Sequence, residues 1–224
     1  DKIGFLVEII AHMFQERVRF KKLQLAAERE IETATSESER NRWKNEASRY
    51  KSLQTSVKLC LNSCYGALGN EFFLLYEVRQ AEAITTAGRL GIQWIARDIN
   101  EYLTKTTGII KEWVIASDTD SVYITLDGLV NKIFKDKKDT NKIIDFMDKV
   151  CKGPLNDLLK KSSDDLLNYT NAFQQKLDMK REALADRGVW TNKKRYFLNV
   201  WDQEGVRYSK PKIKITGLEA IKSS

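Results

Sequence analysis

Apolar residues recur every three or four positions from the start of the chain, a spacing that predicts an amphipathic helix. Leu6, Ile10 and Met13 share one face of this helix, which should run to about Thr33. The pattern is already under way at Asp1, with no capping residue before it. We therefore expect the chain to be a piece of a longer protein.

A second long helix should follow after a short polar break. Ser36 with Glu39 three residues later is a capping-box signature, which predicts a helix start. From there the sequence has no glycine or proline up to Tyr65, and Gly66 and Gly69 should end the helix. Two long helices joined by a short turn form an antiparallel hairpin.

The pattern changes after a third helix, expected at about Ala81–Thr104. Two short runs rich in β-forming residues follow, Trp113–Ala116 and Val122–Thr125. The four residues Ser117–Asp120 lie between them as the turn of a predicted β-hairpin, and Ser121 could belong to the turn or to the second strand.

The rest of the chain mixes helices with strands. Helices are expected at about Asp127–Phe134, Asn141–Lys152 and Pro154–Leu167. Strands are expected at Lys176–Ala183, Tyr196–Trp201, Val206–Tyr208 and Ile213–Thr216, with Gln203–Gly205 as a turn. A helical hairpin followed by a small antiparallel sheet covered by helices belongs to the α+β class.

Composition narrows the possible functions. The 224 residues are 42% hydrophobic and 31% charged, with a net charge of +7, so the chain can form a core and favours anionic partners. No run approaches the roughly 18 apolar residues of a membrane span, so we expect a soluble intracellular protein without a membrane partner. Three cysteines without a Cys-x-x-Cys pair, and a single histidine at His12, argue against disulfide, zinc and histidine-based chemistry.

Two acidic residues, Asp118 and Asp120, flank Thr119 at the tip of the predicted β-hairpin. Side chains at positions i and i+2 of an extended strand share a face, so the two carboxylates could converge on a divalent cation. The alternative is an ordinary turn, because Asp and Thr both favour turns.

One face of the second helix carries Lys58, Asn62 and Tyr65, spaced four and three residues apart. An ammonium, an amide and a phenol suit a nucleotide, although a solvated polar face would have the same composition. A separate apolar stripe should pack on the protein; it consists of Val57, Leu61, Cys64 and Leu68.

Cations gather in two other places. Arg17 and Lys21 continue the apolar row of the first helix, and two cations four residues apart repel unless an anion lies opposite. From Lys180 to Lys214, ten Lys or Arg stand against four Asp or Glu, which gives +6 of the total +7. A phosphate backbone or a solubilising surface would each explain this excess.

These residues together resemble family B DNA polymerases. The run Lys58–Gly66 resembles their Lys-x-x-x-Asn-Ser-x-Tyr-Gly motif, and Asp118–Ser121 resembles their catalytic Asp-Thr-Asp-Ser motif. Longer stretches resemble the replicative polymerases of T-even bacteriophages, namely Gly66–Asn70, Ala83–Leu103, Trp190–Asp202 and Pro211–Glu219.

The resemblance implies fingers at residues 1–70, with Ser36 near their tip, and an incomplete palm at residues 71–224. It implies that Asp120 binds both catalytic Mg²⁺ ions, with Asp118 beside it. It also implies a dNTP site, formed by Arg17, Lys21, Lys58, Asn62 and Tyr65.

The same resemblance implies a basic motif that binds the primer-template DNA near the primer end. This motif consists of Lys193, Lys194, Arg195 and Tyr196, and Lys214 is expected to join it. Glu182 matches a palm acid close to the metals, although Lys180 stands where the phage enzymes have an acid. The implied reaction is attack of a primer 3′-hydroxyl on the α-phosphate of a dNTP, in the cytoplasm of a phage-infected bacterium.

The sequence departs from the family in what it lacks. The first catalytic motif, which supplies another aspartate, is not found, nor are an exonuclease domain and a thumb, and the fingers hairpin is shorter than in the T-even enzymes. We therefore expect a fragment that is inactive without its missing portion. A non-catalytic nucleic-acid-binding remnant is the alternative, whereas an unrelated phosphotransferase would need a further carboxylate cluster or a phosphate loop.

Overall fold

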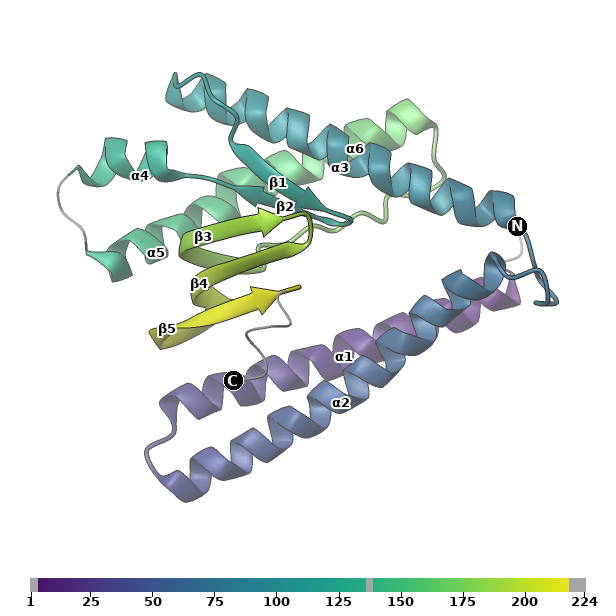
Figure 1. The fold of residues 1–224 in the computed structure, drawn as a ribbon, viewed down its shortest axis with the longest axis horizontal. Coiled ribbons are helices and arrows are strands. Elements are labelled where there is room, and N and C mark those ends of the chain that lie inside the picture. The colour runs from purple at the N-terminus through teal and green to yellow at the C-terminus, as the bar shows by residue number, and fades with distance from the viewer. Residues whose placement is uncertain (1–3, 136–138, 218–224) are drawn as a thin grey trace. The chain divides into compact units, whose positions relative to one another are not determined.

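The computed structural model describes residues 4–135 and 139–217 (Figure 1). Two compact units divide the chain: one holds the chain up to Ile84 together with Glu204–Ser209, and the other holds Thr85–Gln203 and the chain from Lys210 on. Helices and two small antiparallel sheets confirm the α+β class. Within the described ranges, no helix is both long and apolar enough to cross a membrane.

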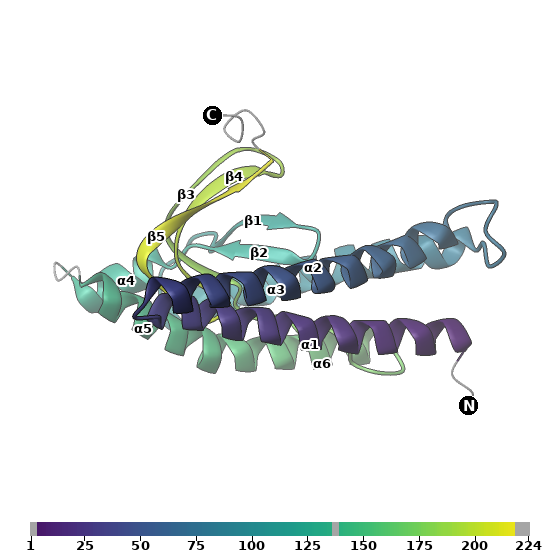
Figure 2. The ribbon, with the colours of Figure 1, turned by 90° about the horizontal axis from the view of Figure 1, so that it is seen from below.

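The first unit is built on the predicted antiparallel hairpin of α1 (Phe5–Thr33) and α2 (Glu37–Leu68), which Figure 2 shows side by side. The capping box is confirmed, because the Ser36 hydroxyl accepts a hydrogen bond from the Glu39 amide at 3.2 Å. Of the two glycines expected to end α2, Gly69 is confirmed as the cap after Leu68, whereas Gly66 lies within the helix. Burial of Leu68 outweighs the roughly 1 kcal/mol cost of one glycine within a helix.

The core of the second unit forms around α3 (Val78–Thr107), which is three residues longer at each end than predicted. Its buried stripe packs with Trp113, which is fully buried, and with Leu155; the stripe consists of Ile95, Ile99 and Leu103. The core thus joins α3 to the segment that leads into the β-hairpin.

The hairpin consists of β1 (Val114–Asp118) and β2 (Ser121–Ile124), paired antiparallel. The predicted four-residue turn is wrong, because Ser117 and Asp118 extend β1 and Asp118 pairs with Ser121. The turn itself contains only Thr119 and Asp120, with Thr119 at φ 51°. Ser121, which was left open, belongs to the second strand.

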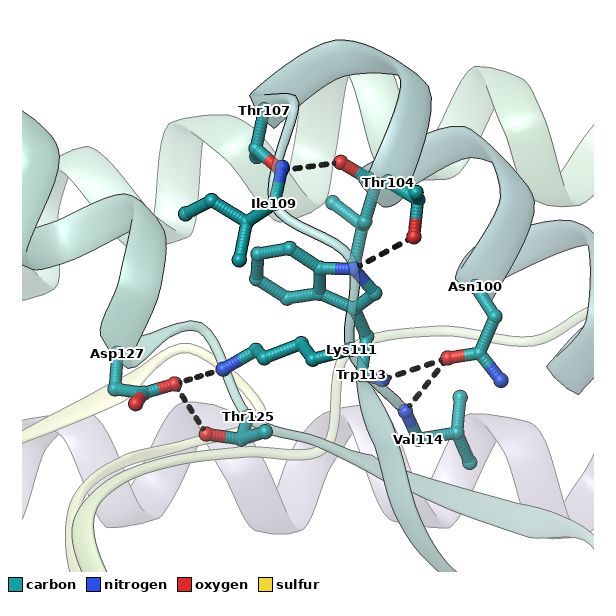
Figure 3. A network of polar contacts seen from close by, with 10 residues as sticks. Asn100, Thr104, Thr107, Ile109, Lys111, Trp113, Val114, Thr125 and Asp127 are labelled. Atoms are coloured by element: carbon teal, nitrogen blue, oxygen red, sulfur yellow. Dashed lines mark hydrogen bonds and ion pairs between the residues drawn. The ribbon is translucent and has the colours of Figure 1, made fainter.

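A clamp of polar contacts fixes the start of β1 (Figure 3). The side-chain oxygen of Asn100 accepts hydrogen bonds from the amides of Trp113 at 2.7 Å and Val114 at 3.0 Å. The indole N–H of Trp113 donates to the Thr104 hydroxyl at 3.1 Å. Through these bonds α3 sets the position at which the hairpin begins.

Helical segments follow the hairpin, and the last three of them are continuous along the chain. They are α4 (Asp127–Phe134), α5 (Thr140–Val150), a π-helical turn (Cys151–Leu155) and α6 (Asn156–Thr170). The sequence predicted a break before Pro154, but this proline lies within the π-helical turn. A local change in helical hydrogen bonding accommodates a proline that would interrupt a regular α-helix.

The second sheet contains β3 (Ala183–Asn192), β4 (Arg195–Gln203) and β5 (Val206–Thr216) in that order. The predicted strand at Lys176–Ala183 is wrong, since β3 begins where that strand was expected to end. β5 is continuous where two strands were predicted, and it tolerates Pro211 because it is an edge strand. The single sheet that was expected is therefore two sheets.

An ion network ties this sheet to the helices. Arg181 lies 2.6 Å from Asp148 of α5 and also donates to Asp202 of β4. The side chains of Arg181 and Asp202 are only 10% and 7% exposed. Removal of one member would leave a buried charge uncompensated, so the network holds β4 against α5.

Replacement of Asn100 by alanine should destabilise the second unit by about 1–3 kcal/mol, because two backbone N–H groups lose their acceptor. Asn100→Asp is the matched control, since it keeps an oxygen at the same position. Urea unfolding of the two variants measures the difference. Equal stability of Asn100→Ala and the unsubstituted chain would contradict the clamp.

Asp127 should make stability depend on acid pH. Its hydrogen bonds from Lys111 and from Thr125 lower the pKa of the carboxyl from 3.8 to about 2. A depressed pKa in the folded state contributes stability that is present above pH 3.8 and is lost as the pH falls toward 2. Urea unfolding at several pH values between 5 and 2 should show a weaker pH dependence for Asp127→Asn, but not for Asp164→Asn on α6.

Candidate functional site

The tip of the β1–β2 hairpin presents two carboxylates on a tightly bonded turn. The Asp120 amide donates to the Asp118 carbonyl at 2.6 Å, and the Ser121 hydroxyl donates to the same carbonyl at 3.1 Å. The Thr119 hydroxyl donates to the Asp118 carboxylate at 3.0 Å. The backbone between the two acids is therefore fixed by the sequence of the turn itself.

This pair of acids could supply part of a metal site. Asp118 is half-buried and Asp120 is exposed, and hard divalent cations prefer such oxygen ligands. Among residues 4–135 and 139–217, no group of three or more His, Cys, Asp or Glu is arranged to hold a metal. Two carboxylates nevertheless fit Mg²⁺, which proteins commonly bind through one or two carboxylates and the phosphates of a substrate.

A basic turn lies beside these acids. Lys193 and Lys194 form the two-residue connection between β3 and β4, with Lys194 at φ 61°. The ammonium of Lys194 lies 3.6 Å from the Asp118 carboxylate. Lys193, Lys194 and Arg195 are all exposed. Two predicted groups of site residues, separated by more than 70 positions in the sequence, thus meet within the second unit.

Tyr196 differs from its basic neighbours because it is buried, with 6% of its surface exposed. Its hydroxyl accepts a hydrogen bond at 2.6 Å from the hydroxyl of Tyr123 on β2. Sequence reasoning did not select Tyr123. The signal was available, because Tyr123 stands two positions after Ser121 and residues so spaced share a strand face.

Lys214 and Glu182 contact each other, with 2.6 Å between the ammonium and a carboxylate oxygen. Lys214 was expected to join the basic turn, and Glu182 was expected near the metals. The chain does pass the basic turn at Gly217, where a β-carbon would lie 2.1 Å from the Lys194 carbonyl oxygen. Only glycine fits at position 217, because any side chain would collide with the Lys194 backbone. The chain just after β5 therefore lies against the basic turn.

In the first unit, Arg17 and Lys21 lie on the half-buried face of α1, in the row begun by Leu6 and Ile10, as predicted. Lys21 pairs with Glu204 at 2.6 Å. The Arg17 Nε atom is buried and has no hydrogen-bond partner among the described residues. The row that starts apolar therefore ends in two partly covered cations.

The predicted two faces of α2 are confirmed. Lys58, Asn62 and Tyr65 are exposed, and 42% of the Tyr65 surface is accessible. The apolar stripe is turned inward, as the partial or complete burial of each member shows: Val57, Leu61, Cys64 and Leu68. A cation, an amide and a phenol are thus all available on one helix face for a ligand.

The chain is similar to known DNA polymerases over most of its length. Residues 94–224 match the sequence model of the divergent family B DNA polymerases. Over 181 residues, 76% of the chain, the sequence is 44% identical to the DNA-directed DNA polymerase of Escherichia phage RB69 and 42% identical to that of Enterobacteria phage T4. The chain spans about a fifth of the length of these relatives.

Proposed function

Because this chain belongs to the divergent family B DNA polymerases, we propose that it forms the fingers and palm of a phage DNA-directed DNA polymerase. The fingers correspond to residues 1–70 and the palm to residues 71–224. The observation that carries the proposal is the 3.6 Å approach of Lys194 to Asp118. It unites an acidic pair suited to metal-bound phosphate with cations suited to a nucleic-acid backbone.

The reaction is template-directed transfer of a nucleotide from a dNTP to a primer 3′-hydroxyl. Asp120, which is exposed at the tip, would hold the Mg²⁺ ions, and Asp118 would support it. When bound, the two ions activate the primer hydroxyl and neutralise the charge of the triphosphate and the leaving pyrophosphate. The hairpin contributes rigidity, because the bonds within its turn hold the Asp118 carboxylate and the backbone that carries both acids.

The first unit supplies the nucleotide site. Lys58 carries an exposed ammonium for the triphosphate, Asn62 hydrogen-bonds to it, and Tyr65 packs near the nascent base pair. Arg17 and Lys21 add charge to the same triphosphate. Lys21 has to exchange its contact with Glu204 for the phosphate, and such partly exposed ion pairs are weak enough to permit this.

The basic turn and Lys214 bind the primer-template duplex near the primer end. Lys193, Lys194 and Arg195 are exposed and attract phosphates without reading base sequence. Glu182 remains an accessory acid whose negative charge is moderated by Lys214.

Catalysis requires a portion of the polymerase outside this chain. Two carboxylates at the hairpin tip hold the metals incompletely, and a further aspartate from the missing portion completes the site. The chain therefore does not extend primers by itself. A complete polymerase of this kind acts in the cytoplasm of the infected bacterium.

Primer extension tests the proposal directly. The chain mixed with the preceding portion of a phage polymerase should extend a primer in Mg²⁺, whereas the chain by itself should not. Asp120→Asn should reduce extension at least about 100-fold, since metal stabilisation of the transition state is worth several kcal/mol. Asp186→Asn on β3 is the matched control and should retain activity.

Three outcomes would count against this assignment. Extension by the isolated chain would show that no further aspartate is needed. Activity that survives Asp120→Asn would remove Asp120 from the metal site. Tight DNA binding with no extension by any mixture would favour the non-catalytic remnant.

The salt dependence of DNA binding tests the basic turn. Lys193→Ala should weaken binding of primer-template duplexes of different sequence to a similar degree, and it should reduce the slope of log K against log salt by about 0.9. Lys160→Ala on α6 removes the same charge from another exposed position and should leave the slope unchanged. Fluorescence anisotropy at several salt concentrations measures both, and equal slopes for the two variants would exclude Lys193 from the interface.

A further inference from the structure

The contact between the two sheets of the second unit depends on three aromatic residues. Tyr123 of β2 meets Tyr196 of β4 edge to face, with 5.2 Å between ring centroids, and meets Trp190 of β3 at 5.4 Å. Trp190 and Tyr196 are 6.0 Å apart. The two sheets share no strand pairing. The cluster therefore joins the hairpin that carries the acids to the sheet that carries the basic turn, and Figure 1 shows the ribbons of these two elements.

Each side of this cluster lies next to a site motif. Tyr123 follows Asp120 by three residues, and Tyr196 directly follows the exposed run Lys193–Arg195. A shift of Tyr123 relative to Tyr196 would therefore change the distance between the acids and the cations.

Two bonds oppose such a shift, and they differ in strength. Lys194 reaches Asp118 at 3.6 Å with a side chain that is 61% exposed, and exposed ion pairs contribute little. The bond between the Tyr123 and Tyr196 hydroxyls is 2.6 Å long, and Tyr196 is buried. The hydrogen bond is the more costly of the two to break, because the hydroxyl of the buried Tyr196 cannot turn to water, although Tyr123 is only half-buried.

The surroundings keep the Tyr123 hydroxyl protonated. Burial raises the pKa of Tyr123 far above its ordinary value, the hydrogen bond to Tyr196 raises it further, and a hydrogen bond with Ser121 acts against them. The hydroxyl therefore remains a hydrogen-bond donor throughout the neutral range.

We propose that Tyr123 is a positioning residue for primer-template binding: through its hydroxyl bond to Tyr196 it holds the basic turn at a fixed place beside the catalytic acids. This inference rests on the proposed function, because the basic turn is taken to bind DNA. Tyr123 itself contacts neither metal nor DNA and acts through Tyr196.

The test is a double-mutant cycle on the 224-residue chain, read by fluorescence anisotropy with a labelled primer-template duplex. Tyr123→Phe should weaken binding about three- to tenfold, the fold-change that corresponds to the net value of one hydrogen bond. In a Tyr196→Phe background the same substitution should have no further effect, because its partner hydroxyl is already gone. Tyr169→Phe, which removes an exposed hydroxyl on α6, is the matched control and should bind as the unsubstituted chain does.

A second measurement needs no DNA. Hydrogen exchange of the amides at Asn192–Arg195 in the free chain should become at least about threefold faster in Tyr123→Phe, because the turn loses its anchor. The same amides should not respond to Tyr169→Phe. Tyr123→Phe keeps the aromatic ring and its packing, so a faster exchange rate would be due to the loss of the hydroxyl.

The outcomes separate the two proposals. An equal loss of binding from Tyr123→Phe in both backgrounds, or no loss in either, would overturn the role of Tyr123. Failure of the unsubstituted chain to bind the duplex would instead contradict the proposed DNA-binding function. If the unsubstituted chain does not bind the duplex, hydrogen exchange still tests Tyr123. Unchanged exchange at the turn in Tyr123→Phe would overturn its positioning role, whereas faster exchange would support it.

Discussion

The clamp between Asn100 and the two backbone amides at the start of β1 is the constraint on which the second unit depends. Trp113 is fully buried, so the amide groups around it have no access to water and need a protein acceptor. Asn100 supplies that acceptor from α3, the helix whose apolar stripe forms the core. The hairpin therefore starts at a position fixed by the core. This in turn fixes the position of Asp118, which ends β1 four residues further on.

Charge balance decides how the acidic tip is arranged. Two carboxylates separated by one residue repel each other, and the cation of Lys194 beside Asp118 reduces that repulsion in the free protein. The same cation suits a nucleic-acid phosphate. A metal ion that arrives with phosphate would balance the acids instead, which would free the lysine for DNA.

Local signals were sufficient for much of the fold. The capping box at Ser36 and the two faces of α2 depend on residues within a few positions of each other, and both predictions are confirmed. The sequence did not predict β3, because this strand contains Asp186 and Gly188, which have low strand preference by themselves. These residues form a strand by pairing with the apolar, alternately buried β4, and strand preference depends on such context.

The candidate site shows the same division between local and long-range information. The spacing of Asp118 and Asp120 and the run of cations from Lys193 are visible in the sequence, because each motif is contiguous. Their meeting requires β2 and β4 to pack together, and the residue that makes this contact, Tyr123, carries no charge and belongs to no motif that composition would identify. The two hydroxyls come from residues that are far apart in the sequence, so the neighbours of Tyr123 along the chain do not reveal its hydrogen bond to the buried Tyr196. Residues of this kind are therefore found by following hydrogen bonds outward from the motifs, and here that path leads from the basic turn through Tyr196 to the hairpin that carries Asp118 and Asp120.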